Sequence, residues 1–193
     1  MEIKTKIPIS REILVDMETP LSVYRKLADG PYTYLFESVE GGENWARYSL
    51  IGLESSKIIF VKKNQIEVEL NGEIIESFHC DDPLDYIDKL HKSFEIKQID
   101  DLPLFNGGLV GYFGYDCVRY IESRLVDSEP PDLIGTPDAL FMISDEVAVF
   151  DNLKNKLHLI VLVESEDDQE KANMRLDELV DTLKESLPFE DFN

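Results

Sequence analysis

Apolar segments of strand length, separated by short turn signals, constrain the fold of this chain of 193 residues more than any other feature. Between residues 57 and 78 three such segments follow one another, with the sequences KIIFVKK, IEVEL and EIIESF. The breaks between them are Asn64-Gln65 and Asn71-Gly72. Asn-Gly is among the strongest two-residue hairpin signals, and a two-residue hairpin joins antiparallel strands. The stretch 57–78 is therefore predicted to form a β-meander.

Strand-like patterns also occur on both sides of this meander. In the segment 32–37, Tyr32, Tyr34 and Phe36 fall on one face of a strand, because successive side chains point to opposite faces. A polar loop, 40–46, separates this strand from the next. Further strands are expected at 47–53, 139–143, 146–151 and 156–163, the last two joined as a hairpin through residues 152–155.

Two helices are predicted from their first residues. Thr19-Pro20 and Asp82-Pro83 each place a capping side chain before a proline. Such a side chain accepts a hydrogen bond from a free backbone N–H of the first turn, where the missing N–H of proline costs nothing. The chain is therefore expected to enter a helix at both positions.

A third, longer helix is predicted near the end of the sequence. Ser165 and Asp168 form a capping-box pattern, and apolar residues then recur at spacings of four, three, four and four. This stripe, which must pack against another surface, comprises Ala172, Leu176, Leu179, Leu183 and Leu187. Because helices and strands do not alternate regularly, the pattern excludes a doubly wound nucleotide-binding fold. It predicts an α+β fold of mostly antiparallel β-sheets with flanking helices.

The charge balance opposes two classes of partner. The sequence contains 40 Asp and Glu residues against 19 Lys and Arg, a net charge of −21, which repels nucleic-acid phosphates and anionic membranes. The first residues, MEIKTKIPISREILVDM, contain no apolar signal-peptide core, and the longest apolar run (157–163) is too short to span a bilayer. With only Cys80 and Cys117, a reduced cytoplasmic protein is expected, with no nucleic acid and no membrane among its partners.

The glycine-rich segment FNGGLVGYFGYD (105–116) is the first place to look for ligand chemistry. It lacks the lysine of a phosphate loop and the glycine spacing of a dinucleotide site. Glycine inside a strand more often marks a bulge or a close backbone approach, so we interpret these glycines as structural. The alternative is that they line a cleft. No nucleophile–base pattern accompanies the many carboxylates, so neither a catalytic residue nor a metal site is expected in this chain.

A second candidate lies in YLFESVEGGENWARYSLIG, residues 34–52. Glu37 and Ser38 end one predicted strand, and Arg47 opens the next. A free amino acid needs an acceptor for its ammonium group and a donor for its carboxylate, and these side chains supply both kinds of group. Each charge-assisted hydrogen bond contributes about 1.5–3 kcal/mol. The alternative is an ordinary cross-strand Glu–Arg pair on the surface.

Five motifs, taken in order, resemble the N-terminal region of anthranilate synthase component I. They are TPLSVYRKL, YLFES, GGENWARYSLIG, FNGGLVGYFGYD and PDALFMISDEVAVFD. The resemblance covers residues 18–163, and its most specific parts are LFES (35–38), RYSLIG (47–52) and GGLVGYFGYD (107–116). It implies a two-part body with antiparallel sheets; of these two features, the residue patterns by themselves predict the antiparallel sheets.

The resemblance implies a lyase of tryptophan biosynthesis that makes anthranilate from chorismate. Ammonia would come from a glutamine amidotransferase partner, component II. Catalysis and a Mg²⁺ ion belong to a C-terminal chorismate-binding domain. We therefore expect residues 1–163 to form an N-terminal regulatory domain and residues 164–193 an amphipathic helix that leads to that catalytic domain. On this interpretation the chain by itself is a non-catalytic fragment.

The resemblance also implies an allosteric site for feedback inhibition by L-tryptophan. The family's Leu-Leu-Glu-Ser motif aligns with LFES, which places Phe36, Glu37 and Ser38 at the effector, with phenylalanine in place of the second leucine. Arg47 matches the basic residue of the following strand. The rest of the pocket is expected in a Pro-Tyr-Met segment of the C-terminal half. Two alternatives stay open: aminodeoxychorismate synthase component I of the folate pathway, and a stand-alone amino-acid-binding module.

Overall fold

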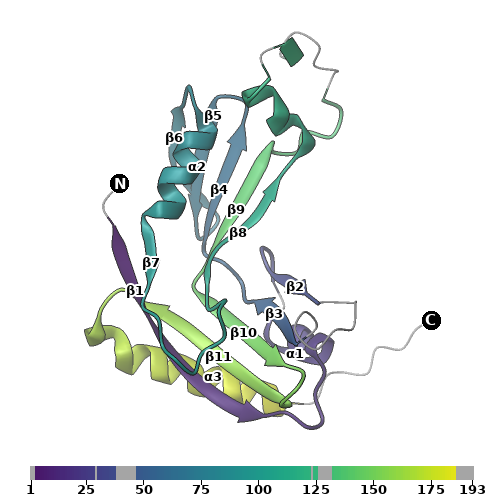
Figure 1. The fold of residues 1–193 in the computed structure, drawn as a ribbon, viewed down its shortest axis with the longest axis vertical. Coiled ribbons are helices and arrows are strands. Elements are labelled where there is room, and N and C mark those ends of the chain that lie inside the picture. The colour runs from purple at the N-terminus through teal and green to yellow at the C-terminus, as the bar shows by residue number, and fades with distance from the viewer. Residues whose placement is uncertain (1–2, 29, 38–46, 123, 126–131, 186–193) are drawn as a thin grey trace, which may run out of the picture. The chain divides into compact units, whose positions relative to one another are not determined.

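The computed structural model describes residues 3–28, 30–37, 47–122, 124–125 and 132–185 (Figure 1). The chain forms two compact units, each with its own β-sheet. The five-stranded unit comprises Met1–Ile3, Ser56–Phe94 and Gly108–Ile143, and the six-stranded unit comprises Lys4–Ser55, Glu95–Gly107 and Ser144–Asn193. Antiparallel strands with a few helices confirm the predicted α+β fold class.

The five-stranded unit has the strand order β6-β5-β4-β9-β8. Its strands are β4 (Lys57–Lys62), β5 (Gln65–Leu70), β6 (Glu73–His79), β8 (Gly108–Phe113) and β9 (Ala139–Ser144). The predicted meander is confirmed, because β4, β5 and β6 pair antiparallel in sequence order. At its second turn Asn71 and Gly72 have φ angles of 52° and 83°, the left-handed conformation that Asn-Gly adopts readily.

Helix α2 (Pro83–Lys92) begins where its capping signal predicted. The Asp82 carboxylate accepts a hydrogen bond of 2.9 Å from the backbone N–H of Asp85. Ile87 and Leu90 on its buried face pack against apolar side chains of β4, β5 and β9. A short 3-10 helix, η1 (Tyr115–Tyr120), follows β8 and adds the buried Cys117 to this core.

Gly111 in β8 is a structural glycine, as the strand context predicted. A Cβ atom at this position would lie 1.9 Å from the carbonyl oxygen of Leu140 and 2.8 Å from the Cα of Phe141. Both contacts are with the backbone of the neighbouring strand β9, which cannot move aside as a flexible side chain can. Only glycine therefore fits this position with the two strands in their present register.

The six-stranded unit has the strand order β2-β3-β10-β11-β1-β7. Its strands are β1 (Lys4–Leu14), β2 (Tyr34–Phe36), β3 (Tyr48–Gly52), β7 (Phe94–Ile96), β10 (Glu146–Asp151) and β11 (Lys156–Val163). The predicted hairpin of β10 and β11 is confirmed. Strand β1, which the sequence did not predict, pairs antiparallel with β11 from Ile7 to Leu14.

Helices α1 (Pro20–Leu27) and α3 (Gln169–Lys184) belong to the six-stranded unit. Thr19 and Ser22 form a capping box at the start of α1, each side chain accepting a hydrogen bond from the other's backbone N–H. A short 3-10 turn, η3 (Glu166–Asp168), precedes α3. The capping box predicted there is wrong in its details, because the Ser165 hydroxyl donates to the Asp168 carboxylate rather than capping a backbone N–H.

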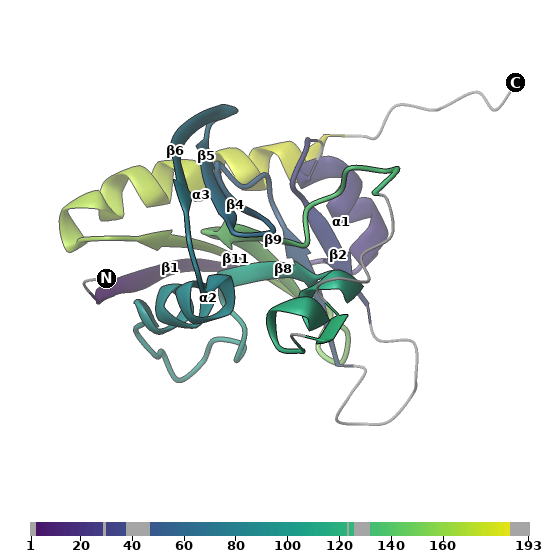
Figure 2. The same cartoon turned by 90° about the horizontal axis from the view of Figure 1, so that it is seen from above.

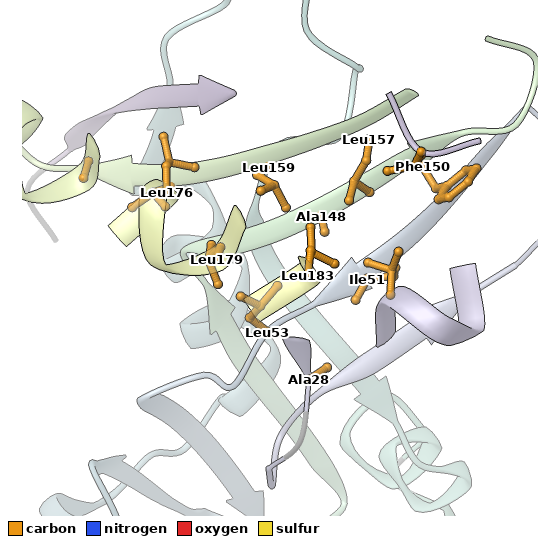
Figure 3. Packing of buried hydrophobic residues seen from close by; sticks show 14 of the residues in the cluster. Ala28, Ile51, Leu53, Ala148, Phe150, Leu157, Leu159, Leu176, Leu179 and Leu183 are labelled. Atoms are coloured by element: carbon orange, nitrogen blue, oxygen red, sulfur yellow. The ribbon is translucent and has the colours of Figure 1, made fainter. Parts of the chain in front are cut away.

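The apolar stripe of α3 packs inside its own unit. Figure 2 shows α3 running along β1 and β11, with α1 beside it. Figure 3 shows the cluster between helices and sheet, where Leu176, Leu179 and Leu183 meet side chains such as Leu159 and Ala148. The stripe therefore finds its surface on the sheet, and by itself it indicates no further partner. Leu187, the last residue of the predicted stripe, lies outside the described residues.

A second, smaller cluster covers the opposite face of the six-stranded sheet. It consists of Val147, Val149, Ile160 and Leu162, with Tyr48, Leu50, Ile96, Leu102 and Phe105 packed around them. Side chains of strands and of the segment that follows β7 therefore form the apolar cluster on this face. Within the described part of the chain, no helix has both the length and the apolar character needed to cross a membrane.

Candidate functional site

The register of β2 and β3 determines where the predicted site residues point. Strand β2 is at the edge of the six-stranded sheet and pairs Tyr34 with Gly52, Leu35 with Ile51 and Phe36 with Leu50. Leu35 joins the cluster under the helices. Because alternate side chains point to opposite faces, Tyr34 and Phe36 lie on the other face. Phe36 is left half-exposed, with 52% of the residue accessible to solvent.

Tyr34 is buried and packs against the ring of Phe36. The two rings stack with their centroids 5.0 Å apart and an angle of 29° between their planes. The Tyr34 hydroxyl shares a buried hydrogen bond of 2.9 Å with Oγ of Ser144. Burial raises the pKa of Tyr34 to about 12 despite the hydrogen bond from Ser144, so this phenol stays neutral under ordinary conditions.

Arg47 is bound to Asp151 rather than to Glu37. Its Nε lies 3.1 Å and 3.0 Å from the two carboxylate oxygens, and its Nη2 lies 2.5 Å from Oδ2. The guanidinium also stacks over the ring of Tyr48, 4.7 Å from its centroid. Asp151 is buried, with 2% of its side chain exposed, whereas Arg47 keeps 30% of its side chain in solvent. The bidentate pair therefore fixes the plane of a guanidinium that solvent still reaches.

Several hydrogen-bond donors stabilise the charged form of the Asp151 carboxylate. Burial would raise the pKa of this carboxyl, but the hydrogen bonds from Arg47 and from the backbone N–H groups of Lys154 and Leu153 outweigh it, and the pKa lies below its ordinary value. The pKa of Arg47 is raised in turn, chiefly by its hydrogen bond with Asp151. Both groups therefore remain charged at neutral pH.

The register also shows which of these residues share a face. Asp151 pairs with Tyr48 in β3, and Val149 pairs with Leu50. Since Leu50 also pairs with Phe36, directly opposed side chains place Phe36, Leu50 and Asp151 on one face of the sheet. The structure therefore places Phe36 and Asp151, the carboxylate that binds Arg47, on the same face of the six-stranded sheet. Glu37 follows directly and is exposed.

Two of the contacts at this edge had no signal in the sequence. Arg47 binds Asp151, and Tyr34 binds Ser144. Neither pair was expected, because the two residues of each pair are more than 100 positions apart in the chain. Ser38, by contrast, was predicted from its motif but lies outside the described residues. Among the residues that are described, no group of three or more His, Cys, Asp or Glu side chains could hold a metal ion.

Because the pKa of Asp151 is lowered in the folded protein, the difference in stability between the wild type and Asp151→Asn should depend on pH. A carboxyl whose pKa is lower in the folded than in the unfolded state stabilises the fold above its unfolded pKa. That contribution is lost as the pH falls through the folded value, from about pH 5 downwards. Asp151→Asn should therefore be less stable than the wild type at pH 7, and the difference should shrink at pH 3. Urea unfolding at both values, on either side of the isoelectric point near 4.4, measures this.

Asp88→Asn is the matched control, because Asp88 forms an exposed ion pair with Lys92 at 2.6 Å on the surface of α2. Exposed pairs contribute only about 0.2–1 kcal/mol. This variant should therefore follow the wild type closely at both pH values. A stability difference for Asp151→Asn that stays constant between pH 7 and pH 3 would mean that the charge of Asp151 does not carry its contribution.

Comparison with known proteins identifies several relatives of the chain. It is 47% identical over 184 residues to anthranilate synthase component 1 of Pseudomonas aeruginosa, covering 94% of this chain and 37% of the relative. It is 45% identical over 186 residues to the same protein of Neisseria meningitidis serogroup B, covering 94% and 38%. The chain thus spans little more than a third of the length of these relatives.

A solved structure and a family comparison agree with these relatives. The crystal structure of anthranilate synthase component I from Streptococcus pneumoniae superimposes with a TM-score of 0.60 at 28% identity, over 93% of this chain and 38% of that one. The family described as chorismate binding enzyme matches residues 39–192, which is most of the chain. The chain therefore belongs to the chorismate binding enzyme family and is similar to the N-terminal part of anthranilate synthase component I.

Proposed function

We propose that this chain is the regulatory, effector-binding part of an anthranilate synthase component I. The longer enzyme would convert chorismate to anthranilate in tryptophan biosynthesis, with ammonia delivered by a glutamine amidotransferase component II. Catalytic residues and Mg²⁺ would belong to its C-terminal domain. The proposal is supported by relatives of that name at 45–47% identity over 94% of this chain. It treats residues 1–163 as the regulatory domain and residues 164–193 as the connection to the catalytic one.

The proposed effector is L-tryptophan. Its ammonium group needs an acceptor, which Glu37 supplies, and its carboxylate needs a donor, which Arg47 supplies. The exposed ring of Phe36 offers an apolar contact for the indole, and Ser38 offers a further hydroxyl. The single observation that carries this assignment is the shared face: the half-exposed Phe36 lies on the same face of the sheet as Asp151, which binds the Arg47 guanidinium.

Asp151 gives this site a defined donor geometry. It binds Nε and Nη2 of Arg47, which are on one edge of the guanidinium, and thereby orients the remaining N–H groups. A donor that is already oriented loses less side-chain entropy when an effector carboxylate binds. Inhibition then requires that tryptophan bind one state of the enzyme better than another, because only differential affinity shifts a conformational equilibrium.

The function is tested with the full-length enzyme that contains this chain, supplied with chorismate, Mg²⁺ and ammonium. We expect anthranilate as the product, and we expect L-tryptophan to inhibit its formation. Formation of aminodeoxychorismate instead would establish the folate-pathway alternative. Anthranilate formation that L-tryptophan does not affect would support the enzyme but refute the effector site.

The chain of 193 residues should by itself bind L-tryptophan only weakly, because part of the pocket is assigned to the C-terminal half. Isothermal titration calorimetry on this chain is expected to give a dissociation constant above about 1 mM, equivalent to less than about 4 kcal/mol of binding free energy. L-phenylalanine and L-lysine serve as control ligands. Micromolar binding that is specific for L-tryptophan would instead favour a stand-alone amino-acid-binding module.

A further inference from the structure

The edge strand β2 is short for an element that carries a binding residue. It contains only Tyr34–Phe36 and pairs with a single neighbour, β3. Backbone pairing of three residues with a single neighbour supplies few hydrogen bonds, so it fixes this strand less firmly than the longer interior strands. Side-chain contacts must therefore fix the position of Phe36. Leu35 provides one anchor on the helix-covered face, and Tyr34 is the anchor on the face of the candidate site.

Tyr34 makes three contacts that fix its position in β2. Its ring lies directly over Gly52 in β3, where a Cβ atom would be 1.9 Å from Cε1 of the ring. Its hydroxyl shares the 2.9 Å hydrogen bond with Oγ of Ser144, a residue that is only 1% exposed. Its ring supports one side of the Phe36 ring at 5.0 Å. The missing side chain at Gly52 thus leaves the space that the Tyr34 ring occupies over β3.

We propose that Tyr34 is a positioning residue for effector recognition: its hydrogen bond with Ser144 holds the ring that orients Phe36 toward the effector. This inference rests on the effector site proposed above. Tyr34 does not touch the effector; it acts through Phe36, whose free ring face is presented to solvent because Tyr34 occupies the other face. Without the hydroxyl, the Tyr34 ring and the Phe36 ring stacked on it are less firmly held. Binding of the effector then costs additional conformational entropy, because Phe36 has to be ordered at the same time.

The test uses Tyr34→Phe, Ser144→Ala and the double variant in the full-length enzyme. Each single variant removes the same hydrogen bond and retains the aromatic stack. We expect the inhibition constant for L-tryptophan to rise about three- to tenfold in either one, the range of one neutral buried hydrogen bond. The double variant should show little further increase, because the two side chains act as a pair. The kcat and the KM for chorismate should stay within about twofold of the wild type.

Two further variants separate positioning from general loss of stability. Tyr120→Phe removes a tyrosine hydroxyl of the five-stranded unit that lies 2.7 Å from both the Lys63 carbonyl oxygen and the Asp138 carboxylate and donates its single hydrogen to one of these two acceptors. It should lower the melting temperature without changing inhibition. Ser144→Thr keeps a hydroxyl at position 144 and should restore most of the inhibition that Ser144→Ala loses.

The outcomes distinguish this inference from the function on which it rests. Inhibition of the wild type together with unchanged inhibition constants for Tyr34→Phe and Ser144→Ala would overturn the positioning role alone. An equal rise in the inhibition constant for Tyr120→Phe would overturn it as well, since the effect would then follow stability. A wild-type enzyme that L-tryptophan does not inhibit would overturn both the effector site and the positioning role.

Discussion

Replacement of Glu37 by alanine is expected to raise the inhibition constant for L-tryptophan by about 10- to 100-fold in the full-length enzyme. The carboxylate is the proposed acceptor for the ammonium group of the effector, and a charge-assisted hydrogen bond contributes about 1.5–3 kcal/mol. Each 1.4 kcal/mol changes an equilibrium constant tenfold. Anthranilate formation in the absence of tryptophan should persist, because Glu37 has no assigned role in turnover. Steady-state kinetics at several tryptophan concentrations measure both quantities.

Two variants sharpen this result. Ser38→Arg introduces a bulky cation beside the proposed ammonium position, so it should abolish inhibition by repulsion and by steric exclusion while turnover persists. Glu73→Ala removes an exposed carboxylate from β6 in the five-stranded unit and should leave inhibition unchanged. Ordinary inhibition constants in both Glu37→Ala and Ser38→Arg would refute the assignment of the effector site to this corner of the sheet.

Replacement of Gly111 by alanine is expected to destabilise the five-stranded unit by about 3 kcal/mol or more. The added methyl group would meet the Leu140 carbonyl oxygen at 1.9 Å, far inside van der Waals contact. Overpacking a close interface costs about 1–3 kcal/mol, and it costs more where the neighbour is backbone that must shift with its strand. Urea unfolding followed by circular dichroism measures the loss, with the slope of the transition as a check on two-state behaviour.

Gly72→Ala is the control for this prediction, because it separates steric clash from backbone strain. Gly72 has a φ of 83°, which disfavours alanine, but a Cβ there meets no atom within 4 Å. Left-handed backbone at a non-glycine residue costs about 1–2 kcal/mol. The Gly111 variant should therefore be the less stable of the two. A loss below about 1 kcal/mol for Gly111→Ala would show that β8 and β9 separate easily, and would remove the steric reason for glycine at this position.

The parts of the fold that the sequence predicted are those with local signals. The meander follows from turns such as Asn71-Gly72, whose strands lie next to each other in the chain. The starts of α1 and α2 follow from a capping side chain next to a proline. Strand β1 was missed because its pairing carries no local signal: Ile7 pairs with Val163. Pro8 within the segment also argues against an interior strand, where proline removes a ladder hydrogen bond.

In the candidate site, too, the residues with a local sequence signal were predicted and the contacts between distant residues were not. Phe36, Glu37 and Ser38 were identified from LFES and Arg47 from RYSLIG, two motifs that are each contiguous in the sequence. The partner of Arg47 was not, because Asp151 is 104 residues away and only the pairing of β3 with β10 brings them together. Sequence alone offered Glu37 as the partner by proximity. Charged residues are abundant in this chain, so no pattern singled out Asp151 among its carboxylates.

The pairing of β1 with β11 has a consequence for how the chain folds as it is synthesised. Strand β1 meets β11 only when about 140 further residues have been synthesised, which takes roughly 7–30 s at ordinary rates of translation, whereas its other neighbour, β7, comes earlier in the chain. The hairpins of β4, β5 and β6 need no such delay, since their contacts are local. The edge of β1 that faces β11 therefore gains its partner only after that interval, and the six-stranded sheet is completed later than the meander.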